Sequence, residues 1–260
     1  MKTIKRLFTI LSIALIASCS SESIAPNNGG ETTDSRGGGG STGQGGSLAR
    51  FTIAKDYLYV VSSNALFSYN LANPSQPEFV GENNIWANVE TIFAMGDYLF
   101  LGTTTGVEIY DISNPSQPKY TSRYEHIVSC DPVVAQGAYA YSTLRTGTNC
   151  WRGENRLDVI DISNISQPEE EWSIVMNNPK GLGISGNYLY MCDNSVLKTF
   201  SLINPARPTE RVFQQLNIDG CFDVIARENR LLVVHTFGLN QYSINPATGA
   251  LTPLSSILVD

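Results

Sequence analysis

Basic residues, histidines and metal-binding motifs are all scarce in this sequence. It contains 17 lysines and arginines against 24 aspartates and glutamates, which gives a formal net charge of −7. A nucleic acid requires a basic face on its partner, so this balance argues against nucleic acid binding. The two histidines, His126 and His235, stand alone in the sequence, and no Cys-x-x-Cys pair occurs. We therefore expect neither a metal site nor a cofactor.

An apolar run from Leu7 to Ala17 follows the basic residues Lys2, Lys5 and Arg6. This run is too short to cross a bilayer as a permanent helix. The order of basic, apolar and small residues is that of a secretory signal peptide. We assign residues 1–18 to this peptide.

The end of the run, Leu15-Ile16-Ala17-Ser18-Cys19, resembles a bacterial lipobox. This resemblance implies cleavage before Cys19 and lipidation of its thiol, which would anchor the chain to a membrane through two or more acyl chains. The alternative is an ordinary secreted protein in which Cys19 has no special role. Residues 19–46 that follow are rich in glycine and serine and poor in apolar residues, so we expect a disordered tether.

A short pattern returns five times in residues 47–260, at steps of about 41 to 49 residues. Each copy begins with a short apolar or aromatic strand and ends near an Asn-Pro or similar turn. The five strand starts are at residues 56–59, 97–100, 138–141, 187–190 and 230–233. Repeats of this length built from short strands are typical of propeller blades. The prediction is an all-β fold, a β-propeller of five blades with four antiparallel strands each, to which no other chain contributes a blade.

The strands can be placed within one copy. For the second copy we predict strands over residues 89–94, 98–102, 107–112 and 119–123, and for the last copy an outer strand over residues 255–259. The turn Asn114-Pro115-Ser116-Gln117-Pro118 separates the third and fourth strands. Asp111 and Asp161 recur beside this kind of turn, which predicts that they cap the backbone.

The third strand of each copy carries a family resemblance. The segments Val107-Glu108-Ile109-Tyr110-Asp111-Ile112 and Leu157-Asp158-Val159-Ile160-Asp161-Ile162 resemble the bacterial LVIVD repeat. Together with the lipobox, the chain is similar to uncharacterised surface lipoproteins of Bacteroidetes-type bacteria. The resemblance implies a β-propeller and a place in the cell envelope, at the outer membrane, on its periplasmic or its outer side. It implies no catalytic residues.

Four cysteines remain besides Cys19, an even number that suits an oxidising compartment. Cys130 and Cys150 belong to the third copy, and Cys192 and Cys221 lie at neighbouring strand ends of the fourth and fifth copies. We predict the disulfides Cys130–Cys150 and Cys192–Cys221, although spacing alone leaves other pairings open.

Propeller topology gathers the irregular loops at one end of the central channel. The longest loop, residues 143–155, follows the second strand of the third copy and would carry arginines and a tryptophan to this loop end. A binding surface needs such groups. The predicted binding residues are Trp86, Arg145, Trp151 and Arg152, which would border a ring of mixed charges at the end of the channel formed by Arg50, Glu90, Asp131, Lys180 and Asp223. Equally, Trp151 could only cover a disulfide while Arg145 and Arg152 are solvated.

Two function classes follow from these residues. We favour a non-enzymatic binding or scaffold module for a glycan, a peptide or an envelope protein. The alternative is a hydrolase or lyase that acts on polysaccharide, which would need a pair of carboxylates in a cleft. Its candidate residues would be Glu90, Asp131, Glu154, Asp219 and Asp223, and no motif singles out two of them.

Overall fold

A computed structural model describes residues 46–125, 132–146 and 154–259. All of them lie in a compact unit that spans Gly39–Asp260. The expected signal peptide and nearly all of the expected tether therefore lie outside the described residues. Within the described part, no helix is long and apolar enough to cross a membrane.

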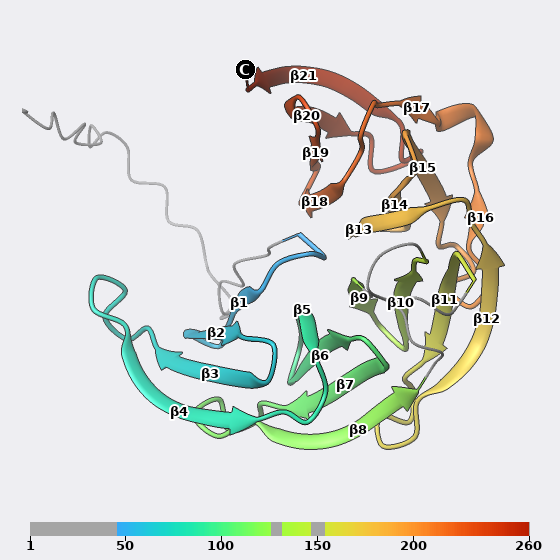
Figure 1. Cartoon of the computed structure of the whole chain (residues 1–260). Coiled ribbons are helices and arrows are strands. Elements are labelled where there is room, and N and C mark those ends of the chain that lie inside the picture. Colours follow the sequence, from blue (N-terminus) through green and yellow to red (C-terminus); the bar gives the residue numbers. More distant parts are fainter. Residues whose placement is uncertain (1–45, 126–131, 147–153, 260) are drawn as a thin grey trace, which may run out of the picture. The chain divides into compact units, whose positions relative to one another are not determined.

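The described residues form five antiparallel sheets, each built from consecutive strands (Figure 1). Blade 1 contains β1 (Phe51–Ala54), β2 (Tyr57–Val61), β3 (Ala65–Asn70) and β4 (Glu78–Asn84). Blade 2 contains β5 (Val89–Met95), β6 (Tyr98–Thr103), β7 (Gly106–Asp111) and β8 (Lys119–Glu125). Blade 3 contains β9 (Val133–Gln136), β10 (Tyr139–Leu144), β11 (Arg156–Asp161) and β12 (Glu169–Val175).

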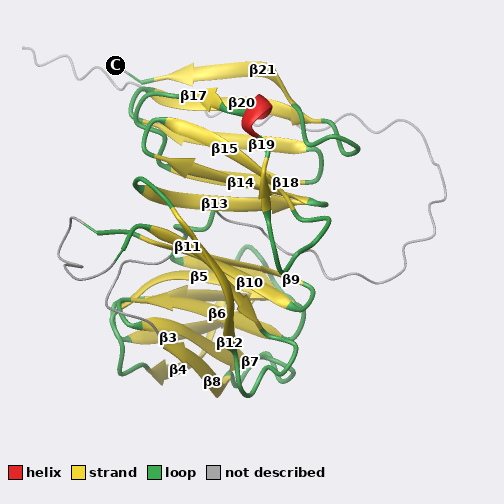
Figure 2. Cartoon of the chain, turned by 90° about the vertical axis from the view of Figure 1, so that its right-hand side faces the viewer, coloured by secondary structure: helices red, strands yellow, loops and turns green. Residues whose placement is uncertain are grey.

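The last two blades follow the same plan with one variation. Blade 4 contains β13 (Pro179–Ser185), β14 (Tyr188–Asp193) and β15 (Val196–Ser201), and its outer edge is divided into β16 (Thr209–Glu210) and β17 (Leu216–Asn217). The helical turn η1 (Val212–Gln214) separates these two pieces (Figure 2). Blade 5 contains β18 (Asp223–Arg227), β19 (Arg230–His235), β20 (Gly238–Ile244) and β21 (Leu251–Leu258). The prediction of an all-β propeller with five blades is confirmed.

Each of the first four blades packs on the next through the second aromatic residue of its second strand. These residues are Tyr59, Phe100, Tyr141 and Tyr190, and none of them is exposed. Each belongs to or adjoins one of four apolar clusters, which join blades 1 and 2, 2 and 3, 3 and 4, and 4 and 5. Burial of aromatic area of this kind is the main source of stability in such a fold.

The local sequence explains the turns that join the first strand to the second and the third strand to the fourth in each blade. The chain reverses between first and second strands through residues with positive φ, such as Gly96 at 57° and Gly186 at 55°. Glycine adopts this conformation without a steric cost. Asp111 and Asp161 accept hydrogen bonds from the backbone N–H groups of Ser113 (2.6 Å) and Ser163 (2.8 Å), so their predicted capping role is confirmed.

The inner strands β1, β5, β9, β13 and β18 lie side by side around the axis, in that order. The chain before β1 also reaches this axis. Ser47 is buried and its hydroxyl accepts a hydrogen bond from the N–H of Leu182 (2.7 Å) in β13, while the carbonyl of Ala49 accepts one from Ile92 (3.0 Å) in β5. Residues 46–49, which lead into blade 1, therefore occupy the centre of the ring and contact blades 2 and 4.

Candidate binding site

The inner strands place several charged residues at one end of the channel. Arg50 directly precedes β1, Glu90 is the second residue of β5 and Lys180 is the second residue of β13. Arg145 directly follows β10 at the same end of blade 3. These four residues, which we call the channel mouth, combine three cations with one carboxylate. Asp131, which the sequence also predicts at this level, lies outside the described residues.

Arg145 is electrostatically close to both Glu90 and Lys180. Burial raises the pKa of Glu90, and the positive charges of Arg50 and Arg145 oppose this increase. Burial lowers the pKa of Lys180, and repulsion by Arg145 lowers it further. Two cations within reach of each other are unfavourable unless an anion lies between or beside them. Glu90 supplies one such anion. Because the four residues still combine three cations with one carboxylate, the channel mouth suits a negatively charged ligand group.

The backbone around these cations is held in place. The hydroxyl of Thr143, at the end of β10, donates to the carbonyl of Lys180 (2.7 Å), and the guanidinium of Arg50 donates to the carbonyl of Val89 (3.1 Å). Thr143 is fully buried. A site on rigid strands needs less ordering when a ligand binds, which favours affinity.

Trp86 lies at the same end, in the connection between β4 and β5, and its side chain is 100% exposed. An exposed aromatic ring offers a flat apolar surface on which a sugar ring or an apolar side chain can pack. Trp151 and Arg152, the other predicted contact residues, lie outside the described residues. The structure thus brings together Arg50, Glu90, Arg145 and Lys180, with Trp86 on a loop at the same end.

Asp223 is separate from the exposed mouth. It opens β18 and is 8% exposed, and its carboxylate accepts hydrogen bonds from the hydroxyl of Ser47 (3.2 Å) and from its own neighbour Val224 (2.8 Å). Burial raises its pKa to about 6, and these hydrogen bonds oppose the increase. The sequence places Asp223 among the mouth residues, but its contacts make it part of the contact between the 46–49 segment and blade 5. Sequence reasoning missed Ser47, because no local pattern marks a partner 176 residues away.

One predicted disulfide is confirmed. Cys192 at the end of β14 is bonded to Cys221, just before β18, with a Cα–Cα distance of 5.4 Å. It joins blades 4 and 5 at the same end as the mouth. The predicted partners Cys130 and Cys150 lie outside the described residues.

Other buried carboxylates are occupied by neighbouring cations. Asp158 pairs with Arg156 (2.8 Å) and receives the hydroxyl of Tyr124 from blade 2 (3.1 Å). Asp193 pairs with Lys198 (3.0 Å). These ion pairs compensate the buried negative charges, so Asp158 and Asp193 have a structural role. Among the alternative catalytic candidates in the described residues, Glu154 and Asp219 are exposed at the surface.

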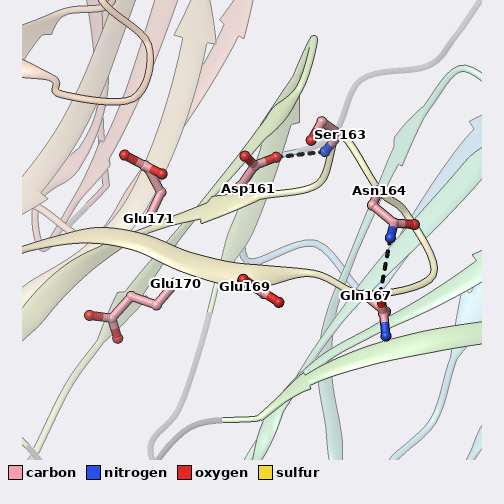
Figure 3. A pocket seen from close by; sticks show the side chains of 7 residues that line it. All are labelled: Asp161, Ser163, Asn164, Gln167, Glu169, Glu170 and Glu171. Carbon is pink, nitrogen blue, oxygen red and sulfur yellow. Dashed lines mark hydrogen bonds between the residues drawn. The ribbon is translucent and has the colours of Figure 1, made fainter.

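The opposite end carries a shallow acidic hollow of about 220 Å³ in blade 3 (Figure 3). Asp161, Glu169, Glu170 and Glu171 line it around the turn that joins β11 to β12. Hydrogen bonds to Ser163 lower the pKa of Asp161, so this carboxylate stays ionised. Within the described residues no group of histidine, cysteine, aspartate or glutamate has the arrangement of a metal site. We therefore regard this hollow as a feature of the β11–β12 turn and not as a binding site.

Comparison with known proteins agrees with the repeat sequence and with the propeller fold. The family model described as the LVIVD repeat matches residues 88–126 and 152–175. These two segments of the chain therefore match the LVIVD repeat. The two matched segments correspond to blade 2 and to the second half of blade 3, where the sequence resemblance is strongest. No curated protein sequence matches the chain significantly.

Solved structures show the same fold at low identity. A functionally unknown protein from Desulfotomaculum acetoxidans has a TM-score of 0.67 and 11% identity, over 81% of this chain and 71% of that one. A protein from Bacteroides uniformis that is provisionally assigned as a 6-phosphogluconolactonase has a TM-score of 0.63 and 12% identity, over 78% of this chain and 69% of that one. At such identities the likeness shows the propeller fold alone.

Proposed function

We propose that this LVIVD-repeat propeller is a non-enzymatic binding module of the cell envelope that takes an anionic group of a glycan, peptide or envelope protein at its channel mouth. The observation that carries the proposal is that Arg50, Arg145 and Lys180 lie together at one end of the inner strands. Burial lowers the pKa of Lys180 there, and repulsion by Arg145 lowers it further. A carboxylate or sulfate bound between them would relieve this repulsion and accept planar hydrogen bonds from Arg145.

Trp86 adds the second element of a glycan or peptide site. Its ring is fully exposed on the loop that leads into β5, the strand that carries Glu90. Aromatic and arginine side chains dominate the binding energy of many interfaces. Their occurrence at one end of the channel supports binding there rather than at the turn end.

We further propose that the module is tethered to a membrane through a lipid on Cys19, with residues 20–45 as the spacer. The lipobox-like sequence at residues 15–19 and the glycine-rich segment that follows support this arrangement. The proposed location is the outer membrane.

A ligand panel tests the proposed function. The full chain is titrated with polygalacturonate, poly-glutamate and dextran as acidic glycan, acidic peptide and neutral glycan, at low and high salt. We expect an acidic probe to bind, with affinity that falls as salt rises because the contact is ionic. The same polysaccharides are assayed for shortening. Binding to dextran alone would refute the anionic site, and shortening of a polysaccharide would refute the non-enzymatic role.

A further inference from the structure

The ring of blades is open between blade 5 and blade 1 (Figure 1). Apolar clusters join four successive pairs of blades, whereas in the described residues no such cluster joins the last blade to the first. Each of these two blades therefore presents one uncovered sheet face to the opening. This arrangement is independent of the channel mouth.

The uncovered face of blade 1 is strongly apolar. Strand pairing places Phe51 opposite Val60, Leu58 opposite Tyr69, and Tyr69 opposite Phe79, all on the side away from blade 2. Phe51 and Phe79 are each 55% exposed. We call this set, together with Ile53 and Phe67, the blade 1 open face. A cluster of large apolar side chains in solvent marks an interaction surface.

The repeat itself shows what covers such a face. The counterparts of Leu58 in blades 2 to 5 are Leu99, Ala140, Leu189 and Leu231, and every one is 0% exposed because the preceding blade covers it. In blades 2, 4 and 5 the preceding blade also donates a tyrosine hydroxyl to a turn carbonyl. Tyr59 donates to Pro115 (2.7 Å), Tyr141 to Pro205 (2.9 Å) and Tyr190 to Gly249 (2.9 Å).

The equivalent acceptor in blade 1 is the carbonyl of Pro74. No hydroxyl from the described residues donates to it. Within the ring, the blade that covers such a leucine carries two aromatic residues on its second strand, separated by one position, like Tyr57 and Tyr59. A further blade with such an aromatic pair would cover Leu58 and reach the carbonyl of Pro74.

Blade 5 does not supply this aromatic pair. In β19, Arg230 and Leu232 take the two positions that are aromatic in all the other blades, so the last blade lacks the hydroxyl donor. A second copy would present the same residues. Residues 20–45 contain no run of alternating apolar residues from which a blade could form.

We propose that the opening binds a further LVIVD-type blade carried by a different polypeptide. Its aromatic pair would pack on the blade 1 open face, and its other face would pack on Leu232 and Leu239 of blade 5 beside Arg227 and Arg230. An acidic residue in the partner suits these two arginines. About three tenths of each of two similar structures has no counterpart in this chain, which is room enough for additional blades on the same fold. The proposal replaces our expectation that no other chain contributes a blade.

Photo-crosslinking in cells that naturally produce the protein tests this directly. p-Benzoylphenylalanine replaces Phe51 on the blade 1 open face or, as the matched control, Phe213, which is 99% exposed on the outer edge of blade 4. A third variant carries it in place of Leu232, so that the result does not depend on one substitution. Thermal melting of each full-length variant verifies that it folds.

We expect adducts at positions 51 and 232 that are several-fold more abundant than at position 213. Mass spectrometry of the joined peptides should identify another polypeptide with a strand that carries two aromatic residues separated by one position. Adducts between blade 1 and blade 5 of one chain, or between two copies, would overturn the proposal in favour of self-closure or self-association. A partner without such strands, or yields equal to the Phe213 control, would overturn it as well.

Discussion

The hydroxyl of Tyr141 in blade 3 donates a hydrogen bond of 2.9 Å to the carbonyl of Pro205 in the turn of blade 4. Tyr59 makes the corresponding bond to Pro115 between blades 1 and 2. Where Phe100 takes this position, the hydroxyl of Ser122 on the outer strand donates to the carbonyl of Ile165 instead. The proline-rich turns of the repeat are thus acceptors that connect each blade to the one before it.

Replacement of Tyr141 by phenylalanine should lower the free energy of unfolding by about 1 kcal/mol, because the buried bond is lost while the ring remains. Urea denaturation of the full chain measures this. Tyr120→Phe serves as the control, since Tyr120 is 51% exposed. Equal midpoints for the Tyr141 variant and the unmodified chain would show that the bond contributes nothing.

The disulfide Cys192–Cys221 closes a loop with a sequence separation of 29. The double substitution of both cysteines by alanine should destabilise the protein by about 3–4 kcal/mol, since the unfolded chain regains the entropy of that loop. Thermal unfolding of the oxidised protein and of the variant gives the difference. Non-reducing peptide mapping that joined Cys221 to Cys130 would contradict the pairing.

Asp223 gives a pH dependence of known sign. Its pKa is about 6 in the folded protein against 3.8 for an unperturbed aspartate, so the folded state binds the proton more tightly. Stability from this group is therefore present at low pH and is lost as the pH rises from about 4 to 6. Asp223→Asn keeps an acceptor for Ser47 and should flatten the stability profile in this window. A profile identical to that of the unmodified chain would show that Asp223 does not titrate there.

Lipidation is tested at Cys19. Cys19→Ala should leave the unprocessed precursor and abolish partitioning into the detergent phase, because the proposed acyl chains would be the anchor. Ser20→Ala, one residue further on, is the matched control and should partition normally. Normal partitioning of the Cys19 variant would contradict the lipid anchor.

Local patterns predicted the strands well. The strands of blade 2 were expected over residues 89–94, 98–102, 107–112 and 119–123, and they occupy Val89–Met95, Tyr98–Thr103, Gly106–Asp111 and Lys119–Glu125. The last strand was expected to begin at Ser255, but it begins at Leu251. Thr252 and Pro253 in this segment do not alternate with apolar residues, and the strand continues there because β20 provides a complete pairing edge.

Long-range features were harder to predict. The disulfide followed from the topology, because Cys192 near the end of β14 and Cys221 just before β18 lie at the same end of neighbouring blades. The division of the outer strand of blade 4 around Val212–Gln214 had no signal in the repeat. The opening between blades 5 and 1 depends on how strongly successive blades turn about the axis, and a strand pattern does not encode this angle. Only in retrospect does Arg230, at a position otherwise occupied by tyrosine, mark the last blade.

The most direct test of the proposed function compares two lysines. Lys180→Ala removes a cation from the channel mouth, whereas Lys119→Ala removes an exposed cation from the start of β8, at the opposite end. The affinity of the full chain for the acidic probe that binds best is measured by calorimetry at low salt. The account predicts that Lys180→Ala weakens binding about fivefold or more while Lys119→Ala leaves it unchanged, since only Lys180 would touch the ligand. Equal affinities of both variants and the unmodified chain would contradict a binding site at the channel mouth.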